Sequence, residues 1–525
     1  MSAPTHLSCR DSDKGRDMAD RDALSLRELY GPLVDGRTSH SAFTHRQLTT
    51  DKRGIVRVTI DILPDDVLLH IFHFCRADGM NTFRVTWKWQ PLVHVCRRWR
   101  HVIFASPRGL DLRLVCTRGT PVQRMVDIWP VIPIIIFDQA EPSSGLPISN
   151  IIAALEHHDR TFGIWLDNLT HSEMQLFSAA TNNRFPELTH LELGPNKDTA
   201  RALPLGFLGG FTPCLRIVRL NGIPFPALPH VLLSSKGLVE LQLRDVPTEG
   251  YISPMAMVAG LSALAHLQKV SIEFRSKGDF DQTSQFPHPR RHIILPALTH
   301  LGFRGTADYI EDFVSRIQAP SLYSVKITLL NQLLFNIPQF AQFIKRTDNL
   351  KSFNQASIAF RDKGARLLLL SSGREVYLAL RIACNGLEQQ VSALAQLCSQ
   401  LYSHVSQVEL LDLEEQRHQR QQHWQDDMDV GQWLELFRTF TAVNTLRLAT
   451  EAGSLAWCAL RGLTAERSTE MFPALCDLYV EEYGESPFIQ EALNQFLSTR
   501  KRSGHTVAVH LWEGQKEHDF EADNT

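Results

Sequence analysis

A recurring leucine pattern in the middle of the chain constrains its fold more than any other feature. Six stretches between residues 185 and 327 approximate the form L-x-x-L-x-L, in which valine, isoleucine or phenylalanine sometimes replaces a leucine. A unit of this kind cannot bury its own apolar face, so neighbouring units have to stack into a continuous core. The last apolar positions lie at steps of 27, 23, 29, 31 and 24 residues, at Leu193, Leu220, Leu243, Ile272, Phe303 and Ile327.

These steps resemble the period of leucine-rich repeats, which is ~20–29 residues, with loop insertions. Fainter units at 349–353, 405–413, 443–448 and 472–480 extend the pattern. The asparagine usual after the strand of such repeats is mostly missing, and Asn221 is the best candidate. The pattern therefore predicts an α/β fold in the form of a degenerate, irregular solenoid. An α/β domain whose strands begin alike by chance is the alternative.

A second feature, residues 61–107, consists of two amphipathic helical segments. Pro64 suits a first helical position, and Asp65 and Asp66 suit the first turn. One face of each segment is apolar at helical spacing, formed by Val67, Leu68, Ile71, Phe72 and Cys75 in the first and by Leu92, Val95, Cys96, Trp99, Val102 and Ile103 in the second. Two segments of this size have more apolar surface than they can hide, which indicates docking onto a partner.

The same residues carry a family resemblance. The run from Leu63 to Leu68 with Ile71 and Phe72, followed by Val95-Cys96-x-x-Trp99, resembles the two halves of an F-box. The resemblance implies a small three-helix unit that binds the Skp adaptor and, through it, the cullin of an SCF-type ubiquitin ligase. The connection 76–90 is longer and more aromatic than is usual and leaves the middle helix unassigned. The whole chain more loosely resembles fungal F-box proteins with a degenerate repeat region.

The partner-binding residues expected from the resemblance are Leu63, Pro64, Val67, Leu68, Ile71, Phe72, Val95, Cys96 and Trp99. Some of them must hold the helices together instead of touching the partner, and the sequence does not sort the two groups. Trp99 is the expected energetic anchor, because large aromatic side chains dominate interface hot spots.

The domain organisation follows from these two features. We expect a flexible N-terminal arm over 1–54, the F-box over 55–108, the leucine-rich-repeat-like solenoid over 109–512 and a flexible tail over 513–525. A helix over 488–499 and a strand over 506–512 should cap the array. Within it, 126–137 reads as one or two buried strands, 275–292 as a loop and 411–427 as a polar helix.

Composition and motifs argue against several classes of function. The net charge of −3 does not favour nucleic acid, and no apolar run of ~20 residues predicts a membrane span. Nine scattered cysteines without a C-x-x-C pair, after an N-terminus without a secretory pattern, favour a cytoplasmic or nuclear protein. No phosphate-binding loop, dinucleotide-binding motif or nucleophile elbow is present. The adjacent His157 and His158 point in different directions on a helix, so we expect surface residues, and neither a metal nor a cofactor.

The leading hypothesis is a non-catalytic adaptor that recruits a protein substrate to an SCF-type ligase. The alternative is a repeat-based interaction scaffold that acts without a cullin. An enzyme would need a constellation of residues that no motif reveals.

Overall fold

A computed structural model describes residues 60–76, 90–106, 110, 112–129, 131–138, 146–196, 202–275, 292–330, 336–371, 373, 376–416, 430–450, 471–481, 487–502 and 504–512. The chain divides into two compact units, Met1–His70 and Ile71–Thr525, with the boundary inside helix α2. We consider each unit by itself. The predicted arm 1–54, the tail 513–525 and nearly all of the connection 76–90 and the loop 275–292 lie outside the described residues.

Short helices and a long series of strands make up the described chain. The first unit holds the 3₁₀ helix η1 (Ile60–Ile62) and the beginning of α2 (Asp65–Arg76). The other helices are α3 (Gln90–Val95), α4 (Arg97–Ala105), α5 (Val122–Ile128), α6 (Ser149–Leu155), α7 (His171–Ala180), α8 (Leu228–Ser234), α9 (Pro254–Leu261), α10 (Ala307–Val314), α11 (Pro338–Arg346), α12 (Leu387–Gln400), α13 (Tyr402–Val405), α14 (Val430–Phe437) and α16 (Pro487–Arg502), with short 3₁₀ helices η2 (Phe207–Gly210), η3 (Thr248–Gly250) and η4 (Asp348–Leu350).

The strands form one sheet of 16 and a separate pair, in the part of the chain that is described. The large sheet contains β1 (Leu114–Cys116), β2 (Ile134–Asp138), β3 (Thr161–Leu169), β4 (His190–Pro195), β5 (Ile217–Asn221), β6 (Glu240–Val246), β7 (Lys269–Phe274), β9 (His300–Gly305), β11 (Ser324–Leu330), β12 (Gln355–Arg361), β13 (Gly364–Leu370), β14 (Tyr377–Ala383), β15 (Leu410–Gln416), β16 (Thr445–Thr450), β17 (Asp477–Glu481) and β18 (Ala508–Trp512). The pair consists of β8 (Ile293–Ile294) and β10 (Ile317–Gln318). The α/β fold class is thus confirmed in its coarse form: a mixed chain with a large, mostly parallel sheet.

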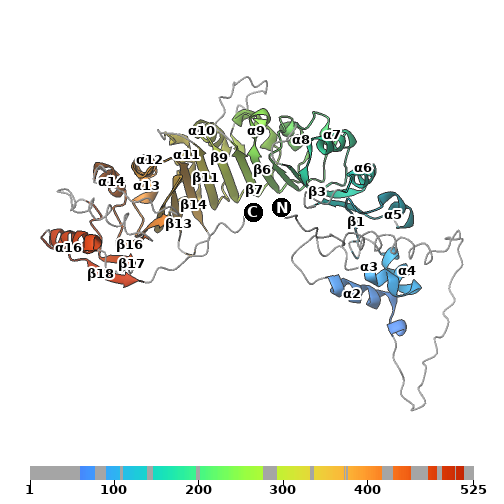
Figure 1. Ribbon diagram of the computed structural model, residues 1–525, viewed down its shortest axis with the longest axis horizontal. Helices are drawn as coiled ribbons and strands as arrows, with labels where there is room; N and C mark the ends of the chain where they lie inside the picture. Colours follow the sequence, from blue (N-terminus) through green and yellow to red (C-terminus); the bar gives the residue numbers. More distant parts are fainter. Residues whose placement is uncertain are drawn as a thin grey trace, which may run out of the picture. The chain divides into compact units, whose positions relative to one another are not determined.

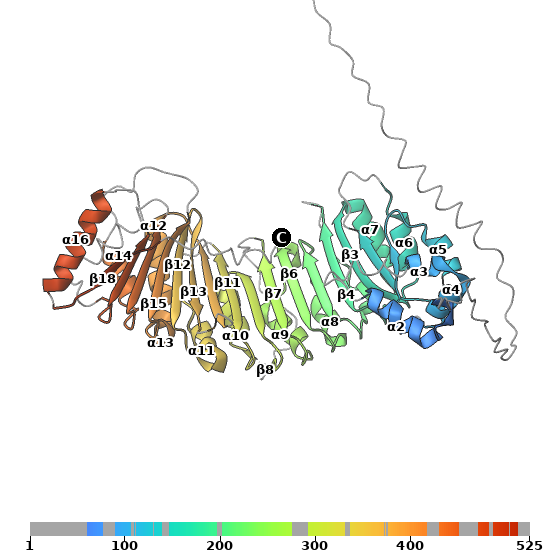
Figure 2. The same cartoon turned by 90° about the horizontal axis from the view of Figure 1, so that it is seen from below.

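Strands that follow one another in the sequence lie next to one another through most of the sheet. From β1 to β7, and on through β9 to β11, every neighbouring pair is parallel. Helices α6 through α12 lie along one face of this sheet (Figure 1), and Figure 2 shows the strands side by side across it. We call the face opposite these helices the open face.

The pairing register agrees with the alignment of the six leucine-containing stretches. Leu193 pairs with Leu220, Leu220 with Leu243, and Leu243 with Ile272, and the row continues through Phe303 to Ile327. A second row two residues earlier runs through Leu191, Val218, Leu241, Val270, Leu301 and Val325. Each of these twelve side chains is at most 4% exposed. The residues between the rows face the open side, since successive side chains of a strand point to opposite faces.

A repeated backbone contact fixes this register at the beginning of each strand. The carbonyl of Thr189 accepts hydrogen bonds from the N–H groups of both Arg216 and Ile217, at 2.8 and 3.0 Å. The carbonyl of Arg216 accepts in the same way from the N–H groups of Val239 and Glu240, just before and at the start of β6. Because a carbonyl oxygen has two lone pairs, one group can hold the next unit at two points.

The order of strands reverses once, at residues 355–383. β12, β13 and β14 form an antiparallel meander, and its last strand lies beside β11 while its first lies beside β15. The apolar rows cross this segment without a break, since Ile327 pairs with Leu380, Leu380 with Leu367, and Leu367 with Ile358. The leucine pattern did not predict this meander.

The C-terminal elements match the predicted helix and strand, as α16 and β18. Arg500 of α16 is 1% exposed and donates hydrogen bonds to the backbone carbonyls of Met471 and Phe472. Its charge is thus buried against carbonyl oxygens that would otherwise need another donor.

Two sequence-based assignments were wrong in part. Residues 126–137 hold the end of α5 as well as β2, because the prolines at 130 and 133 separate a helical turn from a strand. Residues 411–416 belong to β15 and are not helical, because Leu411 and Leu413 continue the two buried rows. The remainder of that polar run, including Trp424, His418 and His423, lies outside the described residues.

Candidate protein-binding surfaces

Helix α2 begins at Asp65, one residue after the position predicted at Pro64, and its apolar residues do not share one environment. Pro64 accepts the first helical hydrogen bond, from the N–H of Leu68 at 3.0 Å. Leu68 is fully buried and Phe72 is 3% exposed, whereas Val67 is 38% exposed. Phe74, which lies off the predicted apolar face, is 74% exposed.

The second predicted segment is two helices and not one. Its chain breaks at Cys96, whose extended backbone begins α4 and whose Sγ accepts a hydrogen bond from the N–H of Trp99 at 3.4 Å. The break turns Val95 outward, where it is 58% exposed, and Val93 takes the buried place. The single apolar face predicted through Val95 and Cys96 was therefore wrong, because a capping contact interrupts the helix.

The parts of this helical segment within the second unit pack on one another. The rings of Phe72 and Trp99 lie 4.8 Å apart, and the side chain of Arg100 donates to the carbonyl of Val93 at 3.0 Å. Val102 and Ile103 of α4 are buried. Phe104 also meets Trp129 edge-on at 5.4 Å, which joins α4 to the residue that ends α5.

The structure sorts the nine predicted partner-binding residues by exposure. Two are buried, four are partly buried and three are exposed; these groups are Leu68 and Phe72, then Leu63, Ile71, Cys96 and Trp99, then Pro64, Val67 and Val95. Further exposed apolar side chains, which the sequence reasoning missed, are Ile60, Ile62 and Phe74. The residue types of these three side chains did not predict their exposure, because only packing decides which apolar residues remain exposed.

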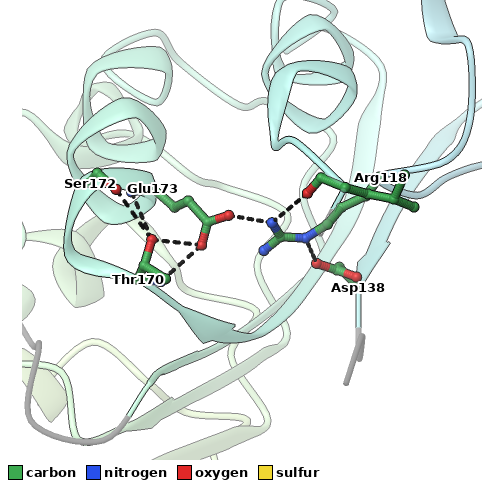
Figure 3. A network of polar contacts seen from close by, with 6 residues as sticks. Arg118, Asp138, Thr170, Ser172 and Glu173 are labelled. Atoms are coloured by element: carbon green, nitrogen blue, oxygen red, sulfur yellow. Dashed lines mark hydrogen bonds and ion pairs between the residues drawn. The ribbon is translucent and has the colours of Figure 1, made fainter. Parts of the chain in front are cut away.

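A buried ion network joins the first strands to helix α7 (Figure 3). The guanidinium of Arg118 bonds to the carboxylates of Asp138, at the end of β2, and Glu173, in the first turn of α7. The exposed fractions of the three side chains are 11%, 6% and 17%. Glu173 also closes a capping box with Thr170, whose backbone N–H and hydroxyl donate to it at 2.9 Å.

The Arg118 network lowers the pKa of Glu173. Burial alone would raise the pKa of Glu173, but hydrogen bonds from Arg118 and Thr170 outweigh burial and lower this pKa. The arrangement holds charges in fixed positions and leaves no proton donor or acceptor poised for catalysis. We interpret the Arg118 network as a structural clamp. No sequence motif predicted it.

The open face carries an aromatic cluster over β3 and β4. The ring of Trp165 lies over Gly163, where a Cβ would come within 2.1 Å of the ring. His190 lies 5.3 Å from Trp165 and 5.8 Å from Phe162, centroid to centroid. Burial and the nearby Arg113, Arg219 and Arg216 lower the pKa of His190 to about 4, so this histidine is neutral at neutral pH.

A ladder of charges continues across the open face next to this cluster. Arg219 on β5 donates to Glu240 on β6 at 2.8 Å and to Glu192 on β4 at 3.2 Å. Near the other end of the sheet, Arg447 lies 3.8 Å from Asp412 and over the ring of Tyr479. Tyr479 in turn stacks on His510 at 4.7 Å.

The described residues hold no group of three or more His, Cys, Asp or Glu side chains that could bind a metal ion. Burial raises the pKa values of Cys116 and Cys398 to about 12, so neither of these two thiols is an activated nucleophile. His158 is in contact with the carbonyl of Arg184 at 2.9 Å, which gives it a structural role.

Comparisons with known proteins do not identify the chain: no family model matches it, and no curated protein matches it. Among the helices described, none combines the length and the apolar character needed to cross a membrane.

Proposed function

We propose that the chain is a non-catalytic, substrate-recruiting adaptor of an SCF-type ubiquitin ligase. In this proposal the helical segment 60–105 is an F-box that binds the Skp adaptor. The array behind it is an irregular leucine-rich-repeat-like solenoid that binds a target protein. The observation that carries the proposal is the set of exposed apolar side chains on α2 and α3, residues that a partner would cover.

The exposure of individual side chains separates the residues that stabilise the helical segment from those that a partner would cover. Phe72, Val93, Val102 and Ile103 are buried and hold the segment together. Phe74 and Val95 are 74% and 58% exposed, and such apolar groups gain most from burial by a partner. Trp99 packs on Phe72 and is only partly buried, so it can serve both purposes.

The regular register of the sheet supports the second half of the proposal. Stacked strand units present many side chains in fixed rows, and this geometry is used by repeat proteins to bind extended surfaces. Ubiquitin transfer would then follow from proximity, since holding two reactants together raises their effective concentration. The chain itself needs no catalytic group, and we expect it to act in the cytoplasm or nucleus.

The direct test is co-purification of the full chain with a Skp adaptor. Phe74→Ser and Val95→Ser should each weaken binding about tenfold, because burial of a large apolar side chain contributes ~1.5–3 kcal/mol. The matched control is Val131→Ser, which changes an 83% exposed valine outside the helical segment and should leave binding unchanged. A folded wild-type chain that does not bind the Skp adaptor would refute the proposal.

A ubiquitination assay with the assembled ligase separates the adaptor from a scaffold that acts without a cullin. The adaptor should bring the cullin into the complex and promote ubiquitin transfer to a bound protein. Skp binding without any recruitment of the cullin would favour the scaffold.

A further inference from the structure

The large sheet ends at strand β18, which has a neighbour on one side only. β18 pairs with β17, and no strand of the described chain lies beyond it (Figure 2). Its sequence, Ala-Val-His-Leu-Trp, holds no proline and no Asp, Glu, Lys or Arg. Prolines and charged residues, especially lysines, are the usual protection of an edge strand against pairing with another chain. The sequence of β18 thus lacks this protection.

One buried apolar row of the sheet ends in an exposed position on β18. The row passes from Leu413 through Leu448 and Val480 to Leu511. The first three side chains are at most 3% exposed, whereas Leu511 is 72% exposed. An apolar side chain on one further strand would complete the row, and covering a leucine in this way is favourable.

The backbone of β18 also directs bonding groups away from the sheet. The N–H of Ala508 donates to the carbonyl of Cys476 at 2.8 Å, so the backbone groups of Ala508 face β17. Because successive residues of a strand direct these groups to alternate sides, the N–H and C=O groups of Val509 and Leu511 point to the outer edge. Edge groups of this kind are a template for another strand. One neighbouring strand would satisfy them and cover Leu511 as well.

We propose that β18 pairs with β18 of a second copy of this chain, antiparallel and around a two-fold axis. An axis perpendicular to the sheet keeps the apolar faces of both copies on the same side, which a parallel pair related by a two-fold axis does not. Val509 lies opposite Leu511 of the other copy, and the two residues exchange both backbone hydrogen bonds. His510 faces its own counterpart at the axis. The sheet continues from one copy into the other.

The charges around β18 favour a second copy as the neighbour. The chain enters β18 after the basic end of α16, where Lys501 and Arg502 are exposed. The sequence after β18 is acidic and contains one lysine, at position 516, beside Glu513, Glu517, Asp519, Glu521 and Asp523. In an antiparallel pair, the chain leaves one β18 near the point where it enters the other. The acidic sequence of each copy therefore starts near the basic residues of the other, and opposite charges attract.

The other edge of the sheet does not offer a competing site. Its strand β1 has three residues, and the side chains of Leu114, Val115 and Cys116 are at most 4% exposed. Pairing of β18 with β1 would be head-to-tail and would produce rings or filaments, whereas pairing of β18 with itself closes after two copies. We therefore expect a dimer and no larger assembly.

The test uses the purified full chain alone, and it does not depend on the adaptor proposal. Two five-residue strands bury much less than the ~800 Å² per partner of a standard interface, so we expect a dissociation constant of ~1–100 µM. Analytical ultracentrifugation over a series of concentrations that spans this range should show a monomer that gives way to a dimer.

A charge on the edge should prevent the pairing. Leu511→Lys should raise the dissociation constant about tenfold or more, because it removes an apolar contact and adds a charge to the edge strand. The matched control is Leu205→Lys, which makes the same change at a leucine that is 80% exposed before η2. It should leave the dissociation constant within about twofold. Circular dichroism checks that both variants are folded.

Cysteine cross-linking tests the register. In the proposed pair, His510→Cys puts two cysteines at a non-hydrogen-bonded position, where Cα atoms lie ~4.5 Å apart and a disulfide can form. Ala508→Cys is the control on the same face of β18, because its counterpart lies ~13 Å away along the strand. Mild oxidation should produce a covalent dimer with His510→Cys above the background of the wild-type chain, which has exposed thiols at Cys214 and Cys476.

Three results would each overturn the inference. They are a chain that stays monomeric at every concentration, equal dissociation constants for Leu511→Lys and Leu205→Lys, and equal cross-linking of the two cysteine variants. Assemblies that grow beyond a dimer would contradict the two-fold pairing as well.

Discussion

The parallel series β1–β11 and the reversed meander β12–β14 supply side chains to the same buried apolar rows. They differ in the order and direction of their strands. In the series, each strand pairs with the strand that follows it in the large sheet, and helices lie in the connections. Only β8 and β10, which form the separate pair, are skipped. In the meander, three strands run antiparallel and lie in reverse order. Yet Leu367 and Leu380 continue the apolar row of Leu243 and Ile272, and all four are at most 4% exposed.

This comparison shows that burial constrains the rows more than chain order does. A strand of either direction can fill a place in the sheet if its apolar residues alternate with the right phase. What differs between the regions is the open face. The parallel series alternates charges in a ladder, whereas the meander puts two arginines opposite each other.

The largest expected difference in stability between the series and the meander comes from removing one ion-paired arginine in each. Arg118→Met should destabilise the beginning of the series by ~3–5 kcal/mol, because it leaves Asp138 and Glu173 buried without their counter-charge. Arg366→Met should cost less than Arg118→Met, because its pair with Glu414 is longer, at 3.8 Å, and more exposed, at 16% and 27%. Urea unfolding followed by circular dichroism measures both. Equal losses would show that the meander depends on ion pairs as much as the series does.

A smaller effect is expected from backbone packing in the meander. A Cβ at Gly364 would lie 2.1 Å from the carbonyl oxygen of Ile382, so Gly364→Ala should cost ~1–3 kcal/mol through overpacking. Gly237 in the series has no such neighbour, its nearest atom being 4.0 Å away. Gly237→Ala is therefore the control, expected to stay within about 0.5 kcal/mol. Hydrogen exchange should rise in β13 and β14 for Gly364→Ala alone.

The smallest expected difference is in pH dependence. The pKa of His190 is lowered from 6.5 to about 4 in the folded chain, so the unfolded chain takes up its proton first as the pH falls. Stability from this group is complete above pH 6.5 and is lost between 6.5 and 4. His190→Asn should flatten that loss, measured as the urea midpoint at pH 7, 6 and 5.

His404 gives the counterpart next to the meander, where it lies 6.2 Å from Phe353, just before β12. Burial and Lys345 lower its pKa too, in the same direction. His404→Asn should flatten this loss too, because the pKa of His404 is lowered in the folded chain. An unchanged pH dependence in His404→Asn would contradict this prediction.

Much of the fold was predictable, because the local spacing of apolar residues determines which stretches form strands and helices. The six L-x-x-L-x-L stretches predicted the strands, and α16 lies where helical spacing placed it. The meander was not predictable, because its strands are nearly as apolar as the repeat strands and nothing local states which neighbour each will pair with. The sequence did not predict the break at Cys96, because cysteine is an uncommon residue at a helix N-cap.

The candidate binding surfaces were predictable only in outline. The sequence indicated that 61–107 has surplus apolar surface, but only packing showed that Val67, Phe74 and Val95 face outward while Leu68 and Val93 do not. The facing Arg366 and Arg381 of the meander gave no sequence signal, because strand pairing alone brings them together.

The sequence by itself determined the unit: a buried L-x-x-L-x-L strand and a connection, repeated at a variable step, behind an amphipathic helical segment. Those features depend on interactions within a few residues, which any copy of the stretch would reproduce. Only the tertiary structure decided the order of the strands, the clamp at Arg118 and the charge pattern of the open face. These arise from contacts between distant residues, whose free energy depends on which neighbours the fold supplies.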